Sequence, residues 1–351
     1  MSSMRILWSR RARSIRRPRL SAPIGIILSA ILLLVGCAMP ASQGAPGGKA
    51  VQSAIATYQG TPGAQAFDPS VGAPLPANRI IAAYGIVGGI EVNGPASTLQ
   101  LLDNFQPKFQ ALGKQYADLD PTHPVKLGLD LVVNTFDLCQ SPRYCSTWAT
   151  DDLIKQYVDY CQKHDLLLFL DVQLGTEPVT EAMTNHLLPY LQKYPFVELA
   201  LDTEFHFPDT PDGHAGAAAY DRGWMDINDI NWTIDKLAQL SLQQHLPRKV
   251  LIIHQFATEV IRCDNGNQGL PCKNKIKRDP NVSIVFQTDG FGAVDAKLFG
   301  YYAFVQQQLI QYGGYKVFFQ YPGSGAFDTP LQSPADVMRQ LFPQPLFISY
   351  Q

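Results

Sequence analysis

The chain has 351 residues, of which 46% are hydrophobic and 17% charged, and this composition is typical of a folded globular protein. Its net charge of −2 hides a division: the first 20 residues hold seven arginines and no acid, and the remainder holds 21 basic and 30 acidic residues, a net charge of −9. Nucleic acids and anionic surfaces bind cationic faces, so this excess of negative charge argues against both as partners.

The first 36 residues have the layout of a secretory signal. The basic segment Met1–Leu20 precedes the apolar stretch Ser21–Gly36, which ends in small residues. Leu34-Val35-Gly36-Cys37 resembles the lipobox of bacterial lipoproteins. That resemblance implies cleavage before Cys37 and attachment of lipid, including palmitate, to its thiol. The alternative is an uncleaved transmembrane anchor, since the apolar stretch is nearly long enough to span a bilayer. Either way, we expect the rest of the chain on the extracytoplasmic face of the cell membrane.

Residues 37–78 are rich in Gly, Pro, Ala, Ser and Gln and contain few charges, which predicts a flexible tether. Within it, Lys49–Tyr58 has the composition of a short helix, although we expect it to be part of the tether. Residues 79–351 then form one domain, because neither an internal sequence repeat nor a linker-like stretch divides them.

Eight short apolar runs alternate with segments of helical period in this domain. Parallel neighbours need a crossover, so the alternation predicts a parallel sheet, and eight units in about 270 residues predict a closed (β/α)8 TIM barrel. The last run reaches the final residue, so the eighth helix is missing and another segment, such as Lys49–Tyr58, must cover that side. The predicted strands are Arg79–Tyr84, Val125–Val133, Leu166–Asp171, Val197–Glu204, Val250–Gln255, Ser283–Asp289, Lys316–Tyr321 and Leu346–Gln351.

Five cysteines follow Cys37, and export makes disulfide bonds permissible. Cys139 and Cys145 lie in the loop after the second strand, and Cys263 and Cys272 lie in the loop after the fifth. Because each pair is close in sequence within a polar loop, we predict two local disulfides. Cys161, on the predicted helix Asp151–His164, is left as a buried thiol.

Polar residues gather at the C-terminal ends of the predicted strands, where such barrels place their chemistry. They are Asp171, Asp202, Glu204, His254, Asp289, Gln320 and the adjacent Tyr321. On the fourth strand, alternation turns Val197, Leu199 and Leu201 toward the helices, which directs Asp202 and Glu204 into the barrel mouth. Two carboxylates on one face repel each other, which raises the pKa of at least one and suits a general acid. The alternative is a polar plug whose hydrogen bonds are satisfied.

Cofactor and metal sites are less well supported. Gly85-Ile86-Val87-Gly88-Gly89 lacks the spacing of a dinucleotide-binding loop, and we expect no cofactor. Asp171, Asp202, His254 and Asp289 could converge on a divalent ion, as in barrel-type deacetylases or phosphodiesterases. With a single histidine at the strand ends, we expect no metal.

Asp202-Thr203-Glu204 resembles the end of the Asp-x-Asp-x-Glu signature of family 18 glycoside hydrolases, although Val197 and Ala200 stand where two further aspartates are expected. That resemblance implies that Glu204 is the acid and that Asp202 orients the substrate. A broader set of motifs resembles an uncharacterised bacterial family of exported, often lipobox-bearing proteins with a glycosidase-like barrel. Its motifs are Val125–Val133, Leu199–Glu204, His254-Gln255-Phe256, Asp289-Gly290-Phe291-Gly292, Ser333-Pro334-Ala335-Asp336-Val337 and Ser349-Tyr350-Gln351.

These observations predict a membrane-anchored glycoside hydrolase-like protein, a monomer, that acts on a surface or cell-wall glycan. Glu204 and Asp202 are the predicted catalytic residues. Asp171, His254, Asp289, Gln320 and Tyr321 are the predicted substrate-binding residues. The alternative function is a non-catalytic surface lipoprotein that binds a glycan or another ligand.

The predicted anchor can be tested with Cys37→Ser. Without the thiol no lipid can be attached, so we expect the variant to be released into the medium or to remain as an unprocessed precursor. Fractionation followed by mass measurement of the N-terminal peptide distinguishes these outcomes. Processing and membrane retention like those of the parent would exclude the lipobox.

Overall fold

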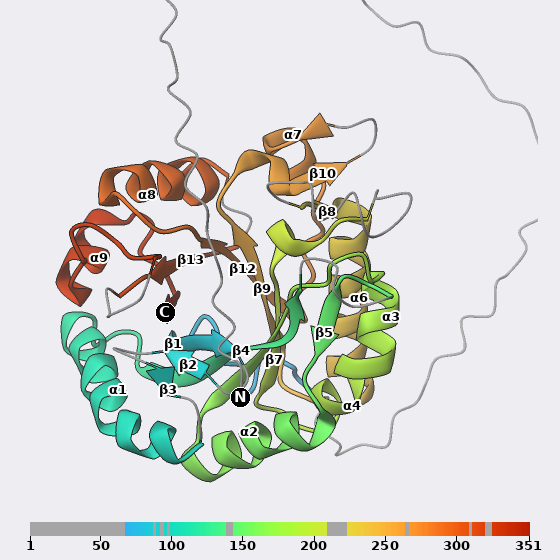
Figure 1. The fold of residues 1–351 in the computed structure, drawn as a ribbon, viewed down its shortest axis with the longest axis horizontal. Helices are drawn as coiled ribbons and strands as arrows, with labels where there is room; N and C mark the ends of the chain where they lie inside the picture. The colour runs from blue at the N-terminus through green and yellow to red at the C-terminus, as the bar shows by residue number, and fades with distance from the viewer. Residues whose placement is uncertain are drawn as a thin grey trace, which may run out of the picture. The chain divides into compact units, whose positions relative to one another are not determined.

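Eight parallel strands close into a barrel, as the sequence predicts (Figure 1). The structure is a computed structural model that describes residues 67–86, 89–91, 95–96, 99–137, 143–208, 223–263, 267–308, 311–319 and 325–351. Around the barrel the strands follow the order β1-β14-β13-β12-β9-β7-β6-β4, and β4 pairs with β1 to close the ring. All eight pairings are parallel. The strands are β1 (Arg79–Ile86), β4 (Val125–Phe136), β6 (Leu167–Val172), β7 (Val197–Leu201), β9 (Lys249–Gln255), β12 (Val282–Thr288), β13 (Tyr312–Val317) and β14 (Phe347–Tyr350).

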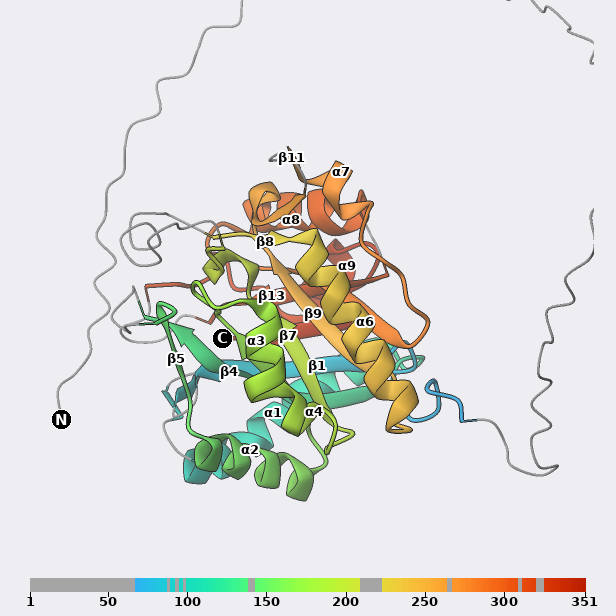
Figure 2. The ribbon, with the colours of Figure 1, turned by 90° about the vertical axis from the view of Figure 1, so that its right-hand side faces the viewer.

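Helices surround the barrel and form the crossovers between its strands (Figure 2). The predicted helix Asp151–His164 is confirmed as α2, which begins with two acidic residues and is followed by Asp165 in the left-handed conformation. The helices are α1 (Leu99–Leu119), α2 (Asp151–His164), α3 (Val179–Ala182), α4 (Leu188–Leu191), α6 (Ile227–Gln243), α7 (Leu270–Lys273), α8 (Val294–Tyr301) and α9 (Pro334–Gln340). Among the described residues, none of the helices is both long enough and apolar enough to cross a membrane.

The connections at the C-terminal ends of the barrel strands contain short additional strands. Two antiparallel strands extend β1, one extends β4, and a separate small sheet joins the connections that follow β7 and β9. The connection after β7 and the connection after β9 therefore each contain a strand, β8 and β10, and these two strands pair in parallel. These strands are β2 (Gly89–Glu91), β3 (Pro95–Ala96), β5 (Ser146–Trp148), β8 (Met225–Asp226), β10 (Ile261–Cys263) and β11 (Asn267–Gln268).

Strand β14 is the last element that the structure describes, and neighbouring helices cover its outer face. Helices α1 and α9 lie side by side where an eighth helix would pack (Figure 1). Tyr116 of α1 and Tyr350 of β14 are buried, and their hydroxyl oxygens are 2.5 Å apart. Helix α1 therefore takes over part of the missing cover; the segment Lys49–Tyr58 lies outside the described residues.

The residues just before β1 pack against the rest of the fold. Arg248 donates its backbone N–H to the carbonyl oxygen of Pro69 over 2.7 Å, and its guanidinium donates to the carbonyl oxygen of Leu75. Leu75 is 1% exposed and belongs to the cluster that fills the barrel interior. Residues 67–78, which the sequence assigns to the tether, are thus part of the packed unit.

The barrel interior and the helix layer form two separate hydrophobic clusters. Val197, Leu199 and Leu201 pack in the outer cluster with the helices, whereas Ala200 lies in the inner one. The predicted alternation along this strand is confirmed. The inner cluster comprises Leu75, Ile80, Ala82, Leu167, Phe169, Ala200, Val250, Ile252, Val285 and Phe347.

The seventh barrel strand lies four residues earlier than the sequence predicts, at Tyr312–Val317 instead of Lys316–Tyr321. Two consecutive glycines, Gly313 and Gly314, weaken its strand signal. Close packing explains these glycines. A Cβ on Gly313 would meet the hydroxyl of Tyr301 and lie 2.7 Å from a methyl group of Val305, and one on Gly314 would lie 2.8 Å from a methyl group of Val285.

The cysteines follow the prediction wherever the structure describes them. Cys263 and Cys272 form a disulfide with a Cα–Cα distance of 5.4 Å, and Cys161 is free and buried. Cys145 is also disulfide-bonded. Cys139 lies outside the described residues, so its bond to Cys145 stays a prediction.

The fit at Gly313 predicts that Gly313→Ala destabilises the protein by about 1–3 kcal/mol, because the added methyl group overlaps buried side chains. Urea denaturation measures the change. Gly325→Ala is the matched control, since its Cβ would meet nothing within 4 Å. Equal stability of the two variants would show that the helix layer moves to accommodate the added methyl group.

Candidate functional site

A layer of polar side chains lies directly above the apolar interior. Each barrel strand has a last inward-facing residue in the apolar interior, which is Gly128 on β4 and Gly314 on β13. Two residues further along the chain, the next inward-facing residue is polar or a tyrosine. The register confirms neighbours within this layer: Tyr84 pairs with Asp130, Gln287 with His254, and Lys316 with Ser349. All its members are at most 5% exposed, and they are Tyr84, Asp130, Asp171, Asp202, His254, Gln287, Lys316 and Ser349.

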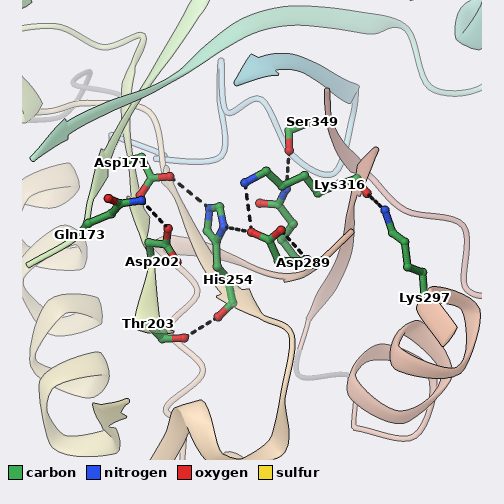
Figure 3. A network of polar contacts seen from close by, with 11 residues as sticks. Asp171, Gln173, Asp202, Thr203, His254, Asp289, Lys297, Lys316 and Ser349 are labelled. Carbon is green, nitrogen blue, oxygen red and sulfur yellow. Dashed lines mark hydrogen bonds and ion pairs between the residues drawn. The ribbon is translucent and has the colours of Figure 1, made fainter. Parts of the chain in front are cut away.

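His254 lies between two carboxylates (Figure 3). Its Nδ1 is 2.7 Å from Oδ2 of Asp289, and its Nε2 is 3.4 Å from Oδ2 of Asp171. Burial alone would lower the pKa of His254, but Asp171, Asp289 and Asp202 outweigh burial and raise the pKa to about 10. With nothing else bound, the imidazole is a cation at neutral pH.

Lys316 is the second buried cation of the layer. It donates to Oδ2 of Asp289 over 3.1 Å, and its Nζ lies 3.3 Å from the centre of the Tyr84 ring. Asp289 also accepts the backbone N–H of Gly290. Burial alone would raise the pKa of Asp289, but Lys316 and His254 hold that pKa well below its usual range. Asp289 is therefore a fixed negative charge shared by two cations.

Asp202 and Glu204 leave the strand that was predicted to hold them. Strand β7 ends at Leu201, and Thr203–Phe205 form a single 3-10 turn. The prediction of an extended strand through Glu204 is wrong, because the backbone at Asp202 turns and the Thr203 hydroxyl then donates to the carbonyl oxygen of His254 over 2.7 Å. The turn is thereby attached to β9 (Figure 3).

The two carboxyl groups occupy different environments. Asp202 is 2% exposed and accepts a 3.2 Å hydrogen bond from Nε2 of Gln173, and burial raises its pKa. Glu204 is half-buried. Burial and the nearby charges of Asp202 and Asp289 raise the pKa of Glu204 well above its usual value. Glu204 is thus a partly accessible carboxylic acid that tends to keep its proton.

The structure brings together four of the predicted site residues: Asp171, Asp202, His254 and Asp289. Glu204 adjoins them through the turn after Asp202. Gln320 and Tyr321 lie outside the described residues. The buried members of the set have their side chains enclosed, so contact with a bound substrate falls to the half-buried Glu204.

Sequence reasoning missed Asp130 and Lys316. Asp130 stands alone in a buried apolar run of β4, and a lone charge in such a run requires a partner, which is a usable signal. Lys316 was placed at the start of its strand; with the strand at Tyr312–Val317, it lies near the C-terminal end, at the level of the site.

Several buried polar atoms in this layer have no hydrogen-bond partner. They include both carboxylate oxygens of Asp130, both of Asp171 and Nε2 of His254. One ligand atom from each of these three residues lies within 4.8 Å of the other two, which makes them a possible metal-binding group within the described part of the chain.

The chain matches no family model and no curated protein. Among solved structures, it is similar to a GH5 family lichenase from Caldicellulosiruptor sp. F32, with 12% sequence identity and a TM-score of 0.35, over 76% of this chain and 83% of that chain. The function of the lichenase is not carried over to this protein. The resemblances to family 18 glycoside hydrolases and to the exported bacterial family stay predictions.

The buried charges predict a strong effect of Lys316→Met, which keeps the side-chain length but removes the cation. Asp289 and its neighbours would lose a buried counter-charge, and breaking such a pair typically costs about 3–5 kcal/mol. The free energy of unfolding in urea measures the loss. Lys126→Met is the control, because Lys126 pairs with Asp165 at the surface, with side chains 40% and 92% exposed. Similar effects of the two substitutions would contradict the paired role of Lys316.

Proposed function

We propose that this protein is a glycoside hydrolase-like enzyme in which Glu204 is the general acid. The observation that supports this proposal is the difference between two neighbouring carboxyl groups: Glu204 is half-buried and tends to keep its proton, whereas Asp289 stays charged beneath it. Cleavage of a glycosidic bond requires a carboxylic acid that protonates the leaving oxygen next to groups that remain negative.

Asp202 has the second role in this proposal. Its buried carboxyl group is held by Gln173, and one of its oxygens has no hydrogen-bond partner. Its charge is the main electrostatic cause of the raised pKa of Glu204. Asp202 thus helps to keep the acid protonated from a buried position beneath the substrate. Asp171, His254 and Lys316 act beneath the substrate by balancing these charges.

Aromatic rings beside Glu204 fit a sugar substrate. Phe136 and Phe205 are half-buried with their ring centres 5.9 Å apart, and Phe207 packs behind Phe136. Half-exposed aromatic faces next to a carboxylic acid are suited to stacking on sugar rings. By contrast, Trp148 stacks on His186 and Tyr350 bonds to Tyr116, so packing accounts for these two rings.

The location of the enzyme is part of the same proposal. The basic and apolar N-terminal segments and the lipobox-like sequence before Cys37 support export and anchoring through a lipid on Cys37. A surface polysaccharide or cell-wall glycan is the substrate that such an anchored enzyme would meet.

The acid role is tested by Glu204→Gln, which keeps the shape of the side chain and removes the proton. We expect the release of reducing ends from the hydrolysed glycan to slow by about 10²–10⁴-fold, with KM nearly unchanged. The substrates are β-glucan, xylan, chitin and peptidoglycan, and the enzyme is the purified full-length protein in detergent. Asp118→Asn, which removes an exposed carboxylate from α1, is the control. Undiminished hydrolysis by Glu204→Gln would exclude the acid role, and a parent that binds a glycan without cleaving it would indicate a binding protein.

The pH dependence gives a second test. A general acid works only while protonated, so activity should fall as the pH rises through the raised pKa of Glu204. Asp202→Asn removes the charge that raises the pKa of Glu204 most, which lowers this pKa and shifts the alkaline limb of the pH–rate profile to lower pH. An unchanged or upward-shifted alkaline limb in this variant would contradict the coupling.

A further inference from the structure

The starting observation is a set of buried polar atoms that lack partners inside the barrel. Asp130 and Asp171 are 0% exposed and His254 is 2% exposed, yet neither carboxylate has a hydrogen bond and Nε2 of His254 has none. Buried polar groups are normally hydrogen-bonded, because burial without a partner costs several kcal/mol per charged group. One atom from each of these three residues lies within 4.8 Å of the other two, and such a group of acceptor atoms without hydrogen bonds indicates that a cation belongs among them.

The spacing of these atoms fits a metal ion. Nε2 of His254 is 3.4 Å from Oδ2 of Asp171, and an oxygen of Asp130 completes a group within 4.8 Å. Two ligands that are each about 2.0–2.2 Å from one ion lie roughly 3–3.5 Å apart in tetrahedral geometry. The three residues come from β4, β6 and β9, and paired strands hold ligands more firmly than loops.

The surroundings of His254 are those of a metal-binding histidine. Its Nδ1–H can donate a 2.7 Å hydrogen bond to Oδ2 of Asp289, which leaves the lone pair of Nε2 for an ion shared with Asp130 and Asp171. Asp289 is itself held by Lys316 and by the N–H of Gly290. Carboxylate–histidine–metal arrangements of this kind fix the ring tautomer and orientation.

A protonated His254 between two aspartates is the competing explanation. It accounts for Asp171 and Asp289, but it leaves both oxygens of Asp130 without a donor. A divalent ion would satisfy Asp130, Asp171 and Nε2 together. We propose that Asp130, Asp171 and His254 bind a divalent first-row transition-metal ion, with Zn²⁺ and Mn²⁺ as the ions to test, since the ligands are one imidazole and two carboxylates.

This proposal differs from the sequence-based expectation of no metal, which rested on a single histidine at the strand ends. Asp130, which that reasoning missed, supplies the third ligand. The ion would be enclosed, because its ligands are at most 2% exposed. The test of the metal site is separate from the test of the acid role of Glu204. Metal binding is measured without a glycan, so either proposal can fail alone.

The test begins with the metal content of the full-length protein, purified with a histidine-free tag and without chelators. After incubation with Zn²⁺ or Mn²⁺ and desalting, we expect elemental analysis to find about one ion per chain and the melting temperature to rise with ion concentration. Mg²⁺ at the same concentration is the comparison ion. It prefers oxygen ligands to imidazole, so we expect it to bind more weakly. A parent protein that retains neither Zn²⁺ nor Mn²⁺ and shows no shift in melting temperature would overturn the proposal.

Substitutions then separate the metal from the ion pair. Asp130→Asn should weaken binding at least tenfold and abolish the metal-dependent rise in melting temperature. Asp289→Asn, which removes the partner of Nδ1, should weaken binding about 10–100-fold. Asp118→Asn is the control and should bind like the parent. In the ion-pair explanation, Asp130 is not a metal ligand, so Asp130→Asn and the parent have the same metal content and the same response of melting temperature to the ion. That outcome would contradict the site.

Discussion

The placement of four buried carboxylates and two cationic side chains at the C-terminal end of the barrel interior controls the rest of the site. Asp130, Asp171, Asp202 and Asp289 face His254 and Lys316, and each of these six side chains is at most 8% exposed. Negative charge exceeds positive charge in a region that water does not screen. Burial, together with the charges of Asp202 and Asp289, raises the pKa of the neighbouring Glu204, and the carboxylates raise the pKa of His254 against the effect of its burial. A protonated acid at the mouth is a consequence of the layer below it.

The barrel tolerates these charges because its lower half is apolar. Ile80, Phe169, Ile252 and Phe347 fill the interior beneath the polar layer, and Leu75 joins them from the segment before β1. The helices bury the other face of every strand in a separate cluster. Stability therefore depends mainly on the lower interior and the helix layer, which leaves the upper interior available for charged groups. This division follows from strand alternation. A residue two positions further along a strand still points into the barrel, but it lies one level higher, in the polar layer.

Much of this arrangement could be predicted from the sequence, and the failures have identifiable causes. The strand–helix alternation and the direction of Val197, Leu199 and Leu201 depend on periodicity along the chain. Periodicity is a local pattern, so a single sequence is enough to predict both. The seventh strand was misplaced because Gly313 and Gly314 are required by packing against α8 and β12, and such packing leaves no periodic signal. The turn at Asp202 depends on a hydrogen bond from Thr203 to β9, a contact between residues 51 positions apart.

Pairing across the barrel is the information that a single sequence lacks most. Asp171, His254 and Asp289 were identified as polar residues at strand ends. That His254 lies between the two aspartates depends on which strands are neighbours. Asp130 and Lys316 were missed because each belongs to the site only through residues on other strands. Once the strand order is known, every inward residue at this level can be assigned from alternation alone, and both omissions are corrected.

The two proposals are linked through the charge at His254. Without an ion, the imidazole carries one positive charge between Asp171 and Asp289. A divalent ion on Nε2 would replace that proton with two positive charges at nearly the same point, and Asp130 would gain the partner that it lacks. The net charge beneath Glu204 would then be one unit more positive, so the acid would keep its proton less strongly than in the metal-free protein. A bound ion and a retained proton on Glu204 are therefore opposed in this barrel, and the position of His254 between Asp171 and Asp289 is the physical connection between them.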